Sequence, residues 1–113
     1  RRGITGRADA FLATHPDESF FITFTVAGEL ACGQSANQRT DWERLCRPYP
    51  MLSWSPEVSW QYGEIYRSLA TDGRLIGAND MWIAATARAL NMPVVTNNKD
   101  EFERVPGLVV IGF

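Results

Sequence analysis

The last third of the chain contains two adjoining stretches that decide the fold, RLIGANDMWIAATA at residues 74–87 and PVVTNNKDEF at residues 93–102. The first stretch predicts a helix from Asp80 to Leu90 that has almost no polar face and is therefore central in the fold. The second predicts a short buried strand with a polar cluster at its carboxyl end. Carboxylates gathered at the carboxyl ends of parallel strands are how an α/β domain builds a divalent-metal site.

The rest of the chain predicts the same alternation of helices and strands. Thr40 with Glu43 predicts a capping box, and Ser55 followed by Pro56 predicts a second helix start. We expect helices at residues 7–14, 25–33, 40–47, 55–72 and 80–90, a short turn or helix at 100–104, and strands at 20–24, 51–54, 93–96 and 108–111. This order, without repeats or linkers, predicts one α/β domain with a mainly parallel central sheet flanked by helices.

Size and composition narrow the class of protein. A chain of 113 residues with 45% hydrophobic residues forms one globular domain. A protein dedicated to binding nucleic-acid duplexes is usually basic, and this chain has a net charge of −2. A metal-dependent nuclease gains positive charge at its site from bound cations, so the charge does not exclude one. Nothing suggests secretion, the two cysteines (Cys32 and Cys46) make no metal-ligand spacing, and no apolar run spans a membrane, so we expect a cytoplasmic protein.

Two acids are the main candidates for chemistry. Glu29 lies among apolar residues in the helix that follows the strand predicted at residues 20–24. It is either an exposed acid near the positive end of a helix dipole or a metal-ligand carboxylate. Asp80 opens an apolar helix, where a carboxylate is costly to bury unless it is hydrogen-bonded or holds a cation. The alternative for Asp80 is an N-cap or first-turn acid, with Asn79 sharing that role.

The polar cluster after the strand at residues 93–96 is ambiguous. Asn98 and Glu101 have the spacing of a capping pair. In the alternative interpretation, Asn98 and one of the acids Asp100 and Glu101 complete the surroundings of a metal ion. No phosphate-binding glycine loop or nucleophile elbow is present.

These segments, taken in order, resemble the PIN-domain ribonucleases of the VapC toxin type. The resemblance rests on THPDE at residues 14–18, TVAGEL at 25–30, the segment 77–87 and the segment 95–106. It implies a three-layer PIN-like fold and a Mg²⁺- or Mn²⁺-dependent endoribonuclease that cleaves structured RNA. It also implies the toxin half of a toxin–antitoxin pair, usually a homodimer, neutralised by a VapB-like antitoxin protein.

The resemblance also assigns roles to residues. Glu29 matches the second acid of the family and Asp80 the third, while Asn98, Asp100 or Glu101 takes the place of the fourth. The first acid in the family is an Asp that ends an opening strand, and this chain starts after that point. We therefore expect an N-terminally incomplete domain, weak metal binding and an open sheet edge ready to pair with another chain.

Two further interpretations stay open. The chain could be a catalytically inactive PIN module that retains only the dimer face and the antitoxin groove. Tight antitoxin binding without metal-dependent cleavage would distinguish this from the ribonuclease. A receiver-like or phosphatase-like domain would also gather acids on a parallel sheet, but it needs an Asp at a strand end, and none of the predicted strands ends in one.

Overall fold

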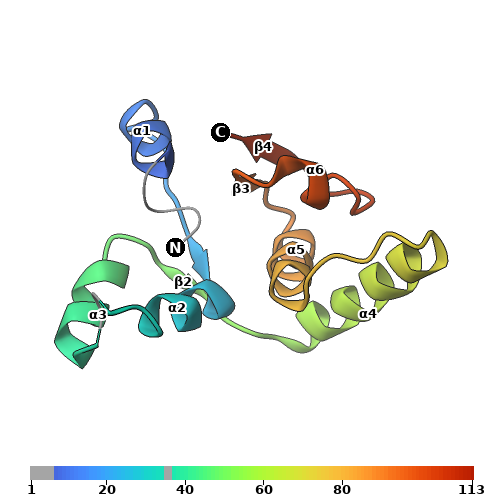
Figure 1. Cartoon of the computed structure of the whole chain (residues 1–113), viewed down its shortest axis with the longest axis horizontal. Helices are drawn as coiled ribbons and strands as arrows, with labels where there is room; N and C mark the ends of the chain where they lie inside the picture. Colours follow the sequence, from blue (N-terminus) through green and yellow to red (C-terminus); the bar gives the residue numbers. More distant parts are fainter. Residues whose placement is uncertain (1–6, 35–36) are drawn as a thin grey trace.

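The computed structural model describes residues 7–34 and 37–113, with side chains from Ala10 onward. The elements in chain order are α1 (Arg7–Ala13), β1 (Ile22–Thr23), α2 (Phe24–Ala31), α3 (Arg39–Cys46), β2 (Met51–Leu52), α4 (Pro56–Thr71), α5 (Ala78–Leu90), β3 (Val94–Thr96), α6 (Lys99–Phe102) and β4 (Val110–Gly112). Figure 1 shows a first half, from α1 to β2, beside a second half, from α4 to β4. Within the described residues, none of the helices combines the length and apolar character needed to cross a bilayer.

Both strand pairs are parallel, as the alternation of elements predicted. β1 pairs with β2, and β3 pairs with β4, with Val94 opposite Val110. The expected single central sheet is wrong for the part of the chain that the structure describes, because the strands there form two separate two-stranded sheets. The two pairs could join into one sheet only through a strand hydrogen-bonded to both, and no described strand lies between them.

The larger core lies between α4 and α5. Ile65 and Leu69 of α4 are almost fully buried, and they pack in one cluster with Ala84 and Ala85 of α5. Alanines on α5 allow the α4 side chains to approach closely, and burial of Ile65 and Leu69 stabilises the fold by about 1.5–3 kcal/mol each. The predicted central position of the helix that starts near Asp80 is therefore confirmed.

A smaller core joins α2 to the first strand pair. Ile22, Ala27 and Leu30 are buried there, and the indole Nε1 of Trp42 donates a hydrogen bond to the carbonyl oxygen of Ala27 at 2.9 Å. Three buried residues make a modest core, so this half has less packing of its own than the α4–α5 half.

Two predicted helix starts are wrong. Helix α2 begins at Phe24 rather than Thr25, because the Thr23 hydroxyl accepts the Val26 backbone N–H and so forms the N-cap. The predicted capping box of α3 is absent, since its N-cap is Gln38 and the Glu43 carboxylate pairs instead with Arg39 at 2.9 Å. The other predicted start is confirmed, because the Ser55 side chain caps α4 and Pro56 is its first residue.

Candidate active site

Glu29 and the start of α5 meet across the molecule. The side-chain Nδ2 of Asn79 donates a hydrogen bond to Oε2 of Glu29 at 3.2 Å, although the residues are 50 positions apart. Asn79 directly precedes Asp80 in the first turn of α5. The structure therefore brings the Glu29 carboxylate to the helix start that also carries Asp80.

Glu29 does not fit the interpretation of an exposed acid at the positive end of its own helix. Helix α2 spans Phe24–Ala31, and its C-cap Cys32 donates its backbone N–H to the Glu29 carbonyl oxygen, so Glu29 is in the last turn. The macrodipole of α2 is negative at that end and disfavours a carboxylate, so the idea of an acid near the positive end of its own helix is wrong. The half-buried side chain of Glu29 reaches the N-terminal end of α5 instead.

Asp80 is buried, with 5% of its surface exposed. The N-cap of α5 is Gly77, so the suggestion that Asn79 or Asp80 caps this helix is wrong, whereas Asp80 is a first-turn acid as the alternative stated. The positive end of the α5 dipole favours a carboxylate at this position. Asp80 is therefore held in a protein interior next to a helix terminus, where ionised carboxylates are stabilised by nearby donors or cations.

Packing between α2 and α5 fixes this arrangement. The Phe24 and Trp82 rings meet edge to face with their centroids 6.0 Å apart, and Trp82 in turn lies 4.2 Å from the Tyr62 ring of α4. Aromatic pairs of this kind add about 0.5–1.5 kcal/mol beyond their buried area. Because Phe24 begins α2 directly after β1, the crossing of the two helices is tied to the carboxyl end of that strand.

The polar cluster after β3 lies on a different element. Asn98 is the N-cap residue of α6 but makes no capping bond through its side chain, so the proposed capping pair with Glu101 is not formed through Asn98. Its backbone N–H donates to the Thr96 hydroxyl at 2.9 Å. Asn98 and Glu101 are half-buried, and Asp100 is exposed. Over the residues whose side chains are described, 10–34 and 37–113, no group of three or more His, Cys, Asp or Glu side chains is placed to hold a metal ion.

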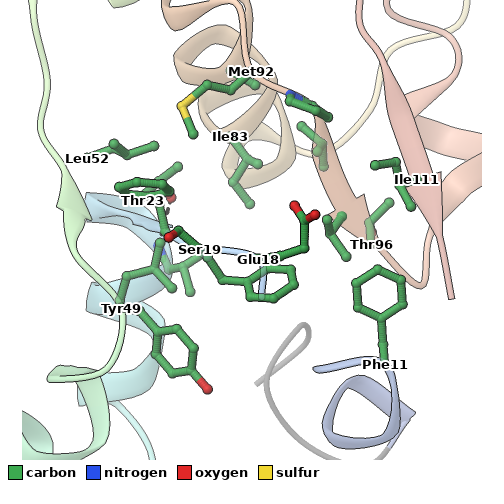
Figure 2. Close-up of a pocket in the computed structure, with 18 of the residues that line it drawn as sticks. Phe11, Glu18, Ser19, Thr23, Tyr49, Leu52, Ile83, Met92, Thr96 and Ile111 are labelled. Atoms are coloured by element: carbon green, nitrogen blue, oxygen red, sulfur yellow. Dashed lines mark hydrogen bonds between the residues drawn. The ribbon is translucent and has the colours of Figure 1, made fainter. Parts of the chain in front are cut away.

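A cavity of about 410 Å³, which was not predicted from the sequence, separates the two strand pairs. Figure 2 shows Thr23 and Leu52 of the first pair on one side, and Thr96 and Ile111 of the second pair on the other. Helix α5 contributes Ile83 to the lining. The only sequence feature that pointed to this cavity was the apolar run before Thr23. That run lacks the polar and apolar alternation of a strand with one solvent-facing side.

The arrangement of helices and strands agrees with the comparisons with known proteins. The family model described as PIN domain matches residues 5–108. The chain belongs to the PIN-domain family. This confirms the family resemblance and the α/β, PIN-like fold class that goes with it.

Curated relatives narrow the resemblance to the VapC type. Ribonuclease VapC2 of Rickettsia felis is 40% identical over 94 residues, which cover 79% of this chain and 70% of the relative. Ribonuclease VapC1 of Haemophilus influenzae strain R2866 is 31% identical over 98 residues, which cover 82% of this chain and 73% of the relative.

Solved structures share the fold. VapBC-1 from nontypeable Haemophilus influenzae superposes with a TM-score of 0.79 at 27% identity, covering 95% of this chain and 85% of that one. VapBC2 from Rickettsia felis, bound to a DNA fragment from the promoter, gives a TM-score of 0.78 at 24% identity, covering 96% and 86%. The second likeness supports the fold alone.

Proposed function

We propose that this PIN domain is a metal-dependent endoribonuclease of the VapC type, the toxin half of a toxin–antitoxin pair. The observation that carries the proposal is the hydrogen bond between Glu29 and Asn79 in the first turn of α5, the turn that also holds Asp80. By the family resemblance we take Glu29 and Asp80 as the second and third acids. The ribonuclease names of the relatives that are 31–40% identical supply the reaction class.

The donor chemistry fits Mg²⁺ or Mn²⁺ in part. Mg²⁺ in proteins usually takes one or two carboxylates and completes its shell with water and substrate phosphate. Glu29 and Asp80 would be those carboxylates, and Asn98, Asp100 or Glu101 would serve from the end of β3. When bound, the ion lowers the pKa of a water molecule and offsets the charge that develops on the scissile phosphate.

The protein's own residues prepare this chemistry. Burial of Asp80 excludes water from one acid, and the Asn79 amide restrains the other. The substrate we propose is structured RNA cut in an unpaired loop, because unstacked bases in single-stranded segments are readable by a protein. The partner we propose is a VapB-like antitoxin that occupies the site, since the similar solved structures are VapBC complexes, and we propose a cytoplasmic homodimer.

Cleavage of a structured RNA tests the proposal. The RNA is incubated with the protein and Mn²⁺, Mg²⁺ or EDTA, and the variants Asp80→Asn and Glu29→Gln are compared with wild type. We expect cleavage that needs the metal and that falls in both variants by more than the roughly 10- to 100-fold cost of losing an outer-shell partner. Asp72→Asn, which changes an exposed acid at the end of α4, serves as the matched control and should cleave normally.

Two results would contradict the roles assigned here. Cleavage that survives EDTA would exclude the metal, and full activity in Asp80→Asn would exclude that residue from the site. A second candidate function, an inactive antitoxin-binding and dimerisation module, is favoured by the absence of a three-acid group among the described residues. Tight binding of a VapB-like protein by a wild-type chain that never cleaves RNA would support that module.

A further inference from the structure

Residues from the two halves of the molecule meet at the candidate site. Glu29 belongs to the first half and Asp80 to the second, and their cores form separate clusters. Helix α2 packs against α5, where the Phe24–Trp82 ring contact and the Asn79–Glu29 hydrogen bond both join the halves. The relative placement of the two acids therefore depends on this helix contact.

The dipoles of the two helices favour this hydrogen bond. In the last turn of α2, the Glu29 carboxylate lies near the negative end of its own helix dipole. The first turn of α5 is a positive helix end, and the Asn79 amide donates from that turn. The bond therefore draws the carboxylate from an unfavourable helix end to a favourable one, the helix turn that also carries the buried Asp80.

We infer that Asn79 is a positioning residue, whose side-chain amide holds the Glu29 carboxylate across the α2–α5 contact and thereby sets the affinity of the site for a divalent cation. An amide that hydrogen-bonds a ligating carboxylate restricts it to orientations that suit the ion. The exposed position of Asn79 gives it little part in the core, so its role is separable from folding. The cation part of this inference rests on the proposed metal-dependent function.

The first experiment does not involve metal. Urea unfolding of wild type, Asn79→Ala, Glu29→Ala and the double variant measures the coupling between the two side chains. We expect the double variant to be destabilised less than the sum of the single variants, with a coupling of roughly threefold to tenfold in the unfolding equilibrium constant. A coupling indistinguishable from unity would overturn the inference whatever the protein does with metal.

The second experiment titrates Mn²⁺ and follows the free ion by electron paramagnetic resonance. We expect Asn79→Ala to weaken Mn²⁺ binding roughly tenfold, and Asn79→Gln, which keeps an amide donor, to recover part of that loss. The matched control is Gln61→Ala, which removes an amide-to-carboxylate hydrogen bond of 2.8 Å to Glu57 within α4. It should change stability slightly and Mn²⁺ affinity not at all.

The outcomes separate the inference from the proposed function. Wild-type Mn²⁺ binding that Asn79→Ala leaves unchanged would overturn the positioning role while the metal-dependent function stands. Absence of Mn²⁺ binding in every protein, wild type included, would overturn both. If Asn79→Ala does not fold, Asn79→Ser takes its place in both experiments, because a serine hydroxyl is shorter and does not span the original contact.

Discussion

Filling the cavity between the strand pairs should stabilise this chain. Ala84 and Ala87 of α5 both belong to the α4–α5 core cluster. Ala87, with 6% of its surface exposed, also lines the cavity, whereas Ala84 is fully buried and does not line it. The same substitution to leucine at these two positions should therefore have opposite effects. At Ala87 the added carbon atoms enter empty space, and at Ala84 they meet packed neighbours.

The size of the effect follows from the added apolar atoms. Three more carbon atoms correspond to roughly 2.4 kcal/mol when fully buried, at about 0.8 kcal/mol for each methylene. Restricting the leucine side chain costs about 0.5–1 kcal/mol. The cavity of about 410 Å³ is larger than the added side-chain atoms. We therefore expect Ala87→Leu to raise the free energy of unfolding by about 1–2 kcal/mol, and Ala84→Leu to lower it by about 1–3 kcal/mol.

Urea unfolding followed by circular dichroism measures both changes, and a thermal scan checks them. For a domain near this size, a gain of 1 kcal/mol raises Tm by roughly 4–8 °C. The reasoning is refuted if Ala87→Leu destabilises the chain as much as Ala84→Leu does, because the space beside Ala87 would then already be filled. Equal and small effects at both positions would show instead that α5 repacks freely.

Three other predictions test separate parts of the structure. Phe102→Ala should lower the free energy of unfolding, measured in urea, by about 3–5 kcal/mol, because Phe102 is 1% exposed in the larger core. A loss under about 1 kcal/mol would contradict that packing. Burial raises the pKa of the Cys46 thiol. The rate at which iodoacetamide alkylates Cys46, measured by mass spectrometry, should therefore keep rising at pH values where the rate for an ordinary thiol has levelled off. A rate for Cys46 that levels off with that of an ordinary thiol would contradict the raised pKa. A short acetylated peptide of alternating leucine and valine should protect the backbone amides of β1 and β3 from hydrogen exchange, because each of these strands has one described strand neighbour and lines the cavity. The same peptide with a central proline should give no protection. Protection confined to β4 would argue against strand pairing in the cavity.

Local signals in the sequence were reliable where one segment decides its own structure. The apolar helix that starts near Asp80, the strand ending at Thr96 and the Ser55–Pro56 helix start are all present. They depend on side-chain periodicity and on capping bonds within a few residues, which any segment carries with it. The same short-range signals, together with the order of the motifs, were sufficient to indicate the PIN-domain family.

Other capping signals failed because a different hydrogen bond or ion pair forms in the folded chain. Thr25 has the right residue type for an N-cap, yet Thr23 takes that place and shares a hydroxyl hydrogen bond of 2.8 Å with Thr25. Glu43 pairs with Arg39 one turn away instead of closing a capping box. Both alternatives are available in the sequence, and the choice between them appears only in the folded chain.

The sequence by itself determined the family, the central helix and the identity of the candidate acids. Tertiary structure alone decided that Glu29 leaves the end of α2 to meet Asn79 at the start of α5, and that the described strands form two pairs around a cavity. The physical reason is that a contact between residues 50 positions apart depends on how two helices pack. That packing is set by the Phe24, Trp82 and Tyr62 rings together, and no single segment encodes it.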